Sequence, residues 1–121
     1  MDFAHFIDGQ WVADSDVTTN RNPANQDDII GTYARGGAGR VDEAVAAAMG
    51  ALDGWANASP QLRHDVLEKA GALIVARKDE LGKLLAREEG KTIAEAVGET
   101  VRAAQVFKFF AGEALRNTGD A

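Results

Sequence analysis

The segment Glu88-Glu89-Gly90-Lys91-Thr92 constrains the fold most, because it resembles a phosphate-binding loop yet predicts a joint between two helices. A phosphate-binding loop has an earlier glycine, separated by four residues from its Gly-Lys-Thr, and a buried strand upstream. Leu85 occupies the position of that glycine, and the leucines between Asp79 and Gly90 recur at helical spacing. The two glutamates would also repel a triphosphate. The segment therefore favours a helix–helix joint over a nucleotide site.

The same segment carries the usual signals of helix ends. Gly90 suits the left-handed residue that follows a helix, and Thr92 with Glu95 forms the pattern of a capping box. One helix is therefore predicted from about Glu80 to Glu89. Another is predicted from Ile93 to about Asn117, just before Gly119, and would be about 37 Å long at roughly 1.5 Å per residue.

The first 38 residues predict a β-arm with loops. Residues 3–7 and 10–13 read as two strands joined by Asp8-Gly9, a strong hairpin signal. The stretch 14–26 is rich in Asp, Thr and Asn and predicts an extended loop. A third strand is expected around residues 29–33, where apolar and β-branched residues cluster.

Residues 39–121 predict a helical region with two further helices before the joint. In the first, Asp42 and Glu43 are expected in the first turn, where the helix dipole favours negative charge. Its apolar face comprises Val41, Val45, Ala48, Leu52 and Trp55. Ser59-Pro60 predicts the N-cap and first residue of the second helix. The apolar stripe of that helix comprises Leu62, Val66, Ala70, Leu73 and Ile74.

The last helix is apolar on several sides. One predicted face comprises Val97, Val101, Ala104, Phe107 and Ala111. Other apolar residues, Val106, Phe109, Phe110 and Ala114, lie mostly off that face. Three helices and a hairpin are too few to cover both sets. We therefore expect a chain that is either an obligate partner in an assembly or a piece of a longer protein.

Composition excludes several classes of partner and chemistry. A net charge of -6 argues against a nucleic-acid partner and an anionic membrane surface. The longest apolar run, residues 44–49, is too short to span a bilayer, and a cytoplasmic location is the default expectation. The chain has no cysteine, so it holds no thiolate metal ligand and no cysteine nucleophile. His5 and His64 have no second ligand at metal spacing, and no metal site is predicted.

No catalytic or cofactor-binding residue emerges from the remaining candidates. Gly36-Gly37-Ala38-Gly39 precedes a predicted helix, but Asp42 stands where a dinucleotide fingerprint has its third glycine. Neither serine, Ser15 or Ser59, has a base nearby in its segment. The glutamates around the helix joint are explained by capping and exposure, apart from Glu99.

An ordered set of motifs nevertheless resembles the amino-terminal portion of the aldehyde dehydrogenase superfamily, an α/β fold. The motifs are Phe6-Ile7-Asp8-Gly9-Gln10-Trp11, Asn22-Pro23-Ala24, Val41-Asp42-Glu43-Ala44-Val45-Ala46-Ala47-Ala48, Trp55 ahead of Arg63, Glu88-Glu89-Gly90-Lys91-Thr92 and Phe109-Phe110-Ala111-Gly112. The residues 87–92 and 107–114 are most similar to the branch that oxidises 2-oxoglutarate semialdehyde (2,5-dioxovalerate).

The resemblance implies a homo-oligomeric enzyme that oxidises an aldehyde with NAD or NADP through a cysteine thiohemiacetal. This chain then corresponds to the first quarter of that enzyme, an incomplete part of its cofactor-binding domain. It is expected to be inactive alone and to bind no cofactor by itself. The family's catalytic cysteine and glutamate lie beyond the stretch that matches.

One residue receives a role by analogy, because the family's long helix lines the aldehyde-entry tunnel. Arg102 is placed to meet the distal carboxylate of an acidic semialdehyde, since arginine binds carboxylates through two hydrogen bonds. The alternative is that Arg102 pairs with Glu95 or Glu99 on the polar face of the helix. The alternative for the whole chain is a free-standing helical interaction module that uses Val106, Phe109 and Phe110.

Overall fold

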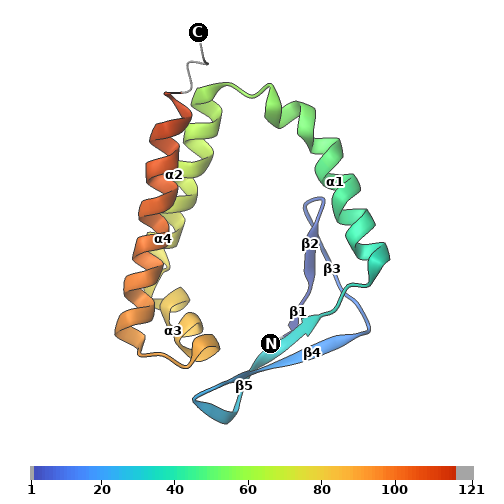
Figure 1. Ribbon diagram of the computed structural model, residues 1–121, viewed down its shortest axis with the longest axis vertical. Helices are drawn as coiled ribbons and strands as arrows, with labels where there is room; N and C mark the ends of the chain where they lie inside the picture. The colour runs from blue at the N-terminus through green and yellow to red at the C-terminus, as the bar shows by residue number, and fades with distance from the viewer. Residues whose placement is uncertain (1, 117–121) are drawn as a thin grey trace. The chain divides into compact units, whose positions relative to one another are not determined.

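The computed structural model describes residues 2–116. The chain forms two units, Met1–Asn57 and Ala58–Ala121. The first unit contains strands β1 to β5 and helix α1, and the second contains helices α2, α3 and α4 (Figure 1). This order confirms the predicted β-arm followed by helices of which the last is long. Asn117 and Gly119, predicted at the end of the last helix, lie outside the described residues.

The predicted Asp-Gly hairpin is confirmed. Strands β2 (His5–Ile7) and β3 (Gln10–Val12) pair antiparallel, with Phe6 opposite Trp11. Asp8 and Gly9 have φ angles of 50° and 74°, the consecutive positive values that a tight hairpin turn requires. The Phe6 and Trp11 rings are 4.9 Å apart, so the cross-strand pair supports the register that the turn sets.

The predicted loop over residues 14–26 is wrong, because most of it is paired backbone. Strand β4 (Val17–Asn22) runs antiparallel to β5 (Asn25–Ala34), with Thr19 opposite Thr32. Between them Asn22 Oδ1 accepts a hydrogen bond of 2.9 Å from Ala24 N–H, which fixes the turn around Pro23. The polar composition that indicated a loop belongs instead to a strand at the edge of a sheet, which faces solvent.

The three-stranded sheet has the order β1-β5-β4, with β1 (Asp2–Phe3) parallel to β5. The predicted third strand is confirmed as the second half of β5, which is longer than expected. Ile30 and Gly31 are its buried residues. Phe3 stacks on Tyr33 across the parallel pair, with ring centroids 4.4 Å apart. β5 is therefore the central strand, which explains why its second half contains buried residues.

Helix α1 (Ala38–Ala56) begins earlier than the sequence predicts. Asp42 and Glu43 consequently lie in its second turn, and its first turn contains no acidic residue. None of its residues is buried. The apolar face recognised in the sequence is real but uncovered within this chain, since Val41 and Val45 are 58% and 55% exposed.

The predicted helix limits in the second unit are confirmed at most ends. Helix α2 (Pro60–Ala76) starts after Ser59, whose hydroxyl accepts a hydrogen bond of 3.1 Å from the backbone N–H of Leu62. Helices α3 (Lys78–Glu89) and α4 (Ile93–Ala114) flank the joint. The 22 residues of α4 span about 33 Å, and the helix ends at Ala114, earlier than predicted.

Small residues form the contacts among these helices. The buried residues of the second unit are Gly71, Gly82, Ala86, Ala96, Thr100, Ala104 and Ala111. A Cβ built on Gly71 would lie 3.1 Å from the carbonyl oxygen of Ala104, so α2 and α4 approach through a position where only glycine fits well. The Lys108 ammonium of α4 also forms an ion pair of 3.3 Å with the Glu68 carboxylate of α2.

The predicted apolar stripe of α2 is only partly its contact face. Ala70 and Ile74 are partly buried. Leu62, Val66 and Leu73 are exposed, at 51%, 46% and 55%. The helix packs on α4 around Gly71 because the close approach of two backbones depends on a missing side chain. A search for large apolar residues at helical spacing does not detect such a face.

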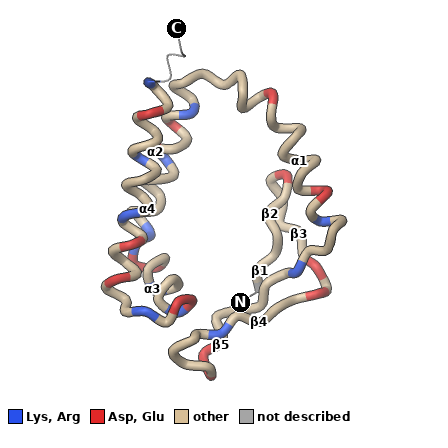
Figure 2. The backbone as a smooth tube through the Cα atoms, in the orientation of Figure 1, with Lys and Arg blue, Asp and Glu red and all other residues tan. Residues whose placement is uncertain are grey.

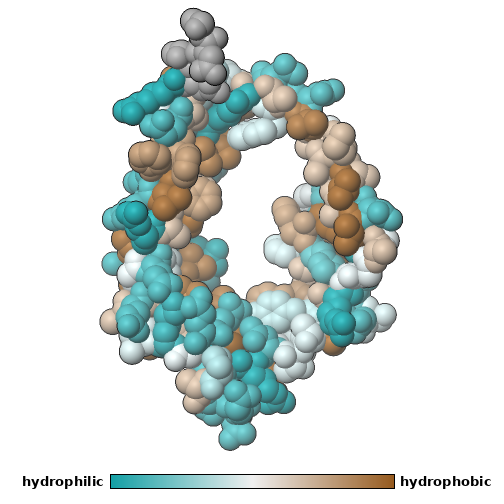
Figure 3. Space-filling model, in the orientation of Figure 1, coloured by the Kyte–Doolittle hydropathy of each residue, from teal (hydrophilic) through white to brown (hydrophobic). Residues whose placement is uncertain are grey.

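The predicted main face of α4 is confirmed except at Phe107, which is 37% exposed, and the other apolar side of the helix lies at the surface. Ala104 and Ala111 are buried, while Val106, Phe109 and Phe110 are 44%, 62% and 55% exposed. Figure 3 shows such apolar side chains, in brown, at the surface of the chain. Among the described residues, no helix is long and apolar enough to cross a membrane.

Candidate functional site

The α3–α4 joint is held by backbone caps, as the sequence predicts. Gly90 adopts the left-handed conformation, with φ 68° and ψ 25°, and its N–H donates to the Ala86 carbonyl oxygen at 2.9 Å. Thr92 Oγ1 accepts from the Glu95 backbone N–H at 3.3 Å, and a carboxylate oxygen of Glu95 accepts from the Thr92 N–H at the same distance. The capping box is thus complete, and it starts α4.

The lysine of this joint is fully engaged by carboxylates. Lys91 Nζ donates to both carboxylate oxygens of Glu99 at 2.7 Å and also forms an ion pair with Glu89. Residues of both charges therefore gather at the turn between α3 and α4 (Figure 2). The bond to Glu89, followed by that to Glu99, raises the pKa of Lys91 above its ordinary value. These contacts give Glu99 the structural role that the sequence left unexplained.

The glycine-rich connection before α1 does not form a dinucleotide site. Gly37 is the N-cap of α1, and Gly39 already lies inside the helix. A Cβ on Gly36 would lie 2.8 Å from Cβ of Arg40 and 3.2 Å from Nε2 of His5, so this glycine serves close packing. This connection therefore does not fit a nicotinamide cofactor.

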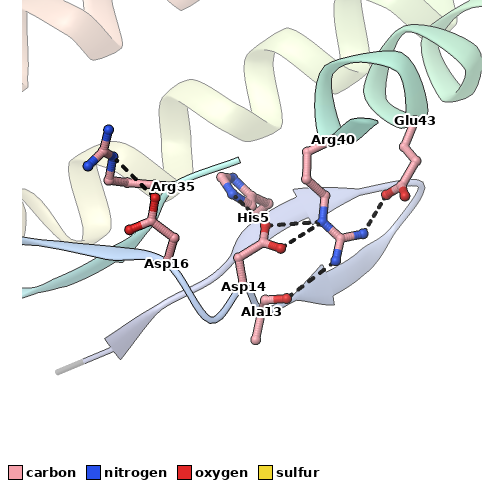
Figure 4. A network of polar contacts seen from close by, with 7 residues as sticks. All are labelled: His5, Ala13, Asp14, Asp16, Arg35, Arg40 and Glu43. Atoms are coloured by element: carbon pink, nitrogen blue, oxygen red, sulfur yellow. Dashed lines mark hydrogen bonds and ion pairs between the residues drawn. The ribbon is translucent and has the colours of Figure 1, made fainter. Parts of the chain in front are cut away.

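A network around Arg40 ties the hairpin to α1, and sequence reasoning did not predict it (Figure 4). Arg40 Nε donates to both carboxylate oxygens of Asp14, at 3.1 and 3.0 Å, and Nη1 donates to Glu43 at 2.6 Å. His5 Nε2 lies 3.3 Å from the same Asp14 carboxylate. The bond to Asp14, and then that to Glu43, raises the pKa of Arg40.

His5, for which the sequence predicts no metal-binding role, lies next to this network through Asp14. Its partner Asp14 lies in the segment predicted as a loop, 26 residues before Arg40. Such a contact has no local signature, since charged pairs at that separation depend on the fold. His64 contacts Asp65 at 3.0 Å on α2. Within residues 2–116, no group of three or more metal-ligating side chains is present.

Arg102 lies on α4 beside the aromatic residues of its exposed side. Its Nη1 donates to Oε1 of Gln105 at 3.3 Å, and both side chains are exposed. A surface depression of about 240 Å³ is lined by Arg102, Gln105, Val106, Phe109 and Phe110. The rings of the two phenylalanines meet edge to face, with centroids 5.3 Å apart. The depression thus combines one cationic group, one amide and an apolar wall.

The alternative prediction, that Arg102 forms an ion pair with Glu95 or Glu99, is wrong, because Arg102 bonds Gln105 instead. Glu95 accepts hydrogen bonds from Thr92, and Glu99 accepts from Lys91. Among residues 2–116, the hydrogen bond of Arg102 is to the neutral amide of Gln105. The guanidinium charge is therefore not compensated by a carboxylate of its own helix.

Comparison with known proteins gives a consistent match. The model of the aldehyde dehydrogenase family matches residues 11–121. The chain is 37% identical over 112 residues to the alpha-ketoglutarate semialdehyde dehydrogenase of Haloferax volcanii, covering 91% of this chain and 23% of that protein. It is 36% identical over 120 residues to the alpha-ketoglutaric semialdehyde dehydrogenase of Bacillus subtilis, covering 98% and 25%.

Solved structures agree with the sequence comparison. The 1-pyrroline-5-carboxylate dehydrogenase from Thermus with bound NAD superposes with a TM-score of 0.91 at 31% identity, covering 95% of this chain and 22% of that one. The chain thus spans about a quarter of the length of the relatives that it matches.

Proposed function

The chain belongs to the aldehyde dehydrogenase family, and from this premise we propose that it forms part of an enzyme that oxidises an aldehyde to a carboxylate with NAD or NADP. A nicotinamide cofactor, held by residues outside this chain, would supply the hydride acceptor for that oxidation. The match over residues 11–121 supports this reaction class. The chain contains no cysteine, so we assign the nucleophile to residues outside it.

In this proposal the chain is the amino-terminal part of the cofactor-binding domain and is inactive alone. The chain covers about a quarter of each relative, which supports the proposal that it is one part of a larger enzyme. The uncovered apolar residues of α1 support the same assignment, because they need a further surface to pack on. The proposal extends to a homo-oligomer, as the family resemblance implies, and to a cytoplasmic location.

We assign the enzyme to acidic semialdehydes, with 2-oxoglutarate semialdehyde as the first candidate. The names of both curated relatives contain that substrate, under its older name. The observation that carries the assignment is Arg102, whose guanidinium lies at a depression on α4 and bonds only a neutral amide among the described residues. A guanidinium without a carboxylate partner attracts the distal carboxylate of such a substrate.

The experiment that tests the proposed function begins with the gene. The reading frame that contains this segment is sequenced in both directions, and the whole encoded protein is purified and assayed for reduced nicotinamide with 2-oxoglutarate semialdehyde. The proposal expects a frame that includes a cysteine-bearing segment, and aldehyde-dependent reduction of NAD or NADP. A complete protein that reduces neither cofactor with any aldehyde would overturn it.

The exposed aromatic side of α4 favours a second candidate function. Phe109 and Phe110 are 62% and 55% exposed, as in a surface that binds another protein. In this alternative the chain is a helical interaction module without catalysis. A reading frame that encodes these 121 residues alone, together with a stable folded monomer, would favour the module.

A further inference from the structure

We infer that Gln105 is a specificity-determining residue, which orients Arg102 and donates a second hydrogen bond to the same substrate carboxylate. This inference rests on the proposed function and deepens it. In the depression on α4, two side chains bind one substrate carboxylate. The Arg102 guanidinium contacts one of its oxygens, and the Gln105 amide contacts the other.

The chemistry of the contact fixes the direction of the Gln105 amide. A guanidinium has only donors, so the atom of Gln105 that lies 3.3 Å from Arg102 Nη1 is the carbonyl oxygen. The amide nitrogen of Gln105 consequently points away from that contact. Within the described part of the chain, this nitrogen makes no hydrogen bond of its own. Two N–H donors are therefore available beside the guanidinium.

The helix keeps the two donor groups together. Residues three apart lie side by side on a helical surface, so Arg102 and Gln105 project from adjacent turns of α4. Both line the same depression as Phe109 and Phe110. The carbonyl oxygen of Gln105 restricts the rotamers of the long arginine side chain, which lowers the entropy lost when a carboxylate binds. Gln105 thus acts through Arg102 as well as directly.

The aromatic wall strengthens the recognition of a charged group. Val106, Phe109 and Phe110 present apolar surface next to the donors. Apolar neighbours reduce the competition of water for the guanidinium and the amide, so each hydrogen bond to a carboxylate gains strength. The depression, about 240 Å³, is smaller than the roughly 300–1,000 Å³ typical of pockets for drug-sized ligands, so it suits one end of a small substrate.

Binding of the substrate carboxylate depends on the charge of the residue at position 105. A glutamate there would pair with Arg102 across one turn and would repel the incoming carboxylate. The neutral amide leaves the positive charge of Arg102 available while still fixing its direction. The inference therefore requires a neutral hydrogen-bonding residue at this position, and size alone is not sufficient.

The test uses the complete enzyme and two aldehydes of equal chain length, glutarate semialdehyde and pentanal. Gln105→Glu is expected to raise KM for glutarate semialdehyde about tenfold, equivalent to about 1.4 kcal/mol, and to leave kcat and the KM for pentanal within about twofold. Gln105→Met, which keeps the length of the side chain and removes both polar groups, is expected to produce a smaller rise of about threefold. Gln10→Glu, the same substitution at an exposed position of strand β3, serves as the matched control and is expected to change KM for neither aldehyde.

The outcomes separate this inference from the proposed function. If Arg102→Ala lowers the preference for glutarate semialdehyde while Gln105→Glu leaves it unchanged, the inference is wrong and the role of Arg102 stands. An equal loss of activity toward both aldehydes in Gln105→Glu would also overturn the inference, because it indicates a structural role. A wild-type enzyme without any preference for the acidic aldehyde would overturn the assignment of Arg102 and this inference together.

Discussion

Gly82 of α3 lies so close to Val97 of α4 that a Cβ added to the glycine would come within 2.5 Å of the valine Cγ2. The backbone of Val97 is also near, with its Cα 2.9 Å and its nitrogen 3.0 Å from that position. Backbone atoms cannot move aside as the end of a flexible side chain does. The α3–α4 contact therefore depends on the absence of a side chain at residue 82.

Gly82→Ala is accordingly expected to destabilise the protein by about 1–3 kcal/mol, the usual cost of inserting a group into a packed contact. Thermal melting of the purified protein measures the effect. Gly98→Ala is the matched control on α4, because a Cβ there has nothing within 4 Å. It is expected to stabilise the helix by about 0.5–1 kcal/mol. Equal melting temperatures for both variants would show that the close approach is absent.

Local signals account for the parts of the fold that the sequence predicted. Asp8-Gly9, Ser59-Pro60, Gly90 and the Thr92–Glu95 box each place a residue type where the backbone or an unpaired N–H requires it. These requirements act within four residues, so they can be recognised in a single sequence.

The features that were not predicted depend on distant partners. Strand β4 has a polar sequence and forms because β5 offers it a backbone ladder. The contact face of α2 is centred on Gly71, which has no apolar side chain to reveal it. The bonds between Arg40 and Asp14 join residues far apart in the sequence. The role of Arg102 was proposed from family resemblance and stays a prediction, whereas its partner Gln105 was not anticipated.

The capping box predicts a pH dependence of stability at acidic pH. The hydrogen bond from the Thr92 hydroxyl, followed by that from its backbone N–H, lowers the pKa of Glu95 below its ordinary value of 4.5. A carboxyl group with a lowered pKa in the folded state stabilises the protein above its unfolded pKa. That contribution is lost as the pH falls through the folded pKa.

The measurement compares the melting temperatures of the wild-type protein and Glu95→Gln between about pH 7 and about pH 3. The wild type is expected to be the more stable protein at neutral pH, and the difference is expected to shrink below the ordinary pKa of glutamate. A difference that stays constant over this range would contradict the proposed role of the carboxylate in the cap.

Removal of the Arg40 guanidinium is expected to loosen the β2–β3 hairpin. Arg40→Gln removes the bonds to Asp14, which link the segment after β3 to α1, and the bond to Glu43 within α1. Hydrogen exchange of the hairpin amides, from Phe6 to Val12, is expected to accelerate. Arg35→Gln is the control, because the Arg35–Asp16 pair is 3.8 Å long and more than 60% exposed on both sides. Equal exchange rates in the two variants would assign no anchoring role to Arg40.

The isolated chain is expected to bind a hydrophobic dye or to aggregate, because Phe109 and Phe110 lie at its surface. The double substitution Phe109→Ser and Phe110→Ser is expected to reduce dye fluorescence. A soluble wild-type monomer that melts cooperatively and binds no dye would contradict this prediction. That result would also mean that the apolar side of α4 needs no further surface to cover it.

The role of Arg102 in selecting an acidic aldehyde is tested most directly by a ratio of kinetic constants. In the complete enzyme, kcat/KM is measured for glutarate semialdehyde and for pentanal, with the wild type and with Arg102→Ala. We expect the wild type to prefer the acidic aldehyde and the substitution to lower this preference by about tenfold to a hundredfold, as for the loss of a charge-assisted hydrogen bond. A preference that Arg102→Ala leaves unchanged would contradict this role of Arg102.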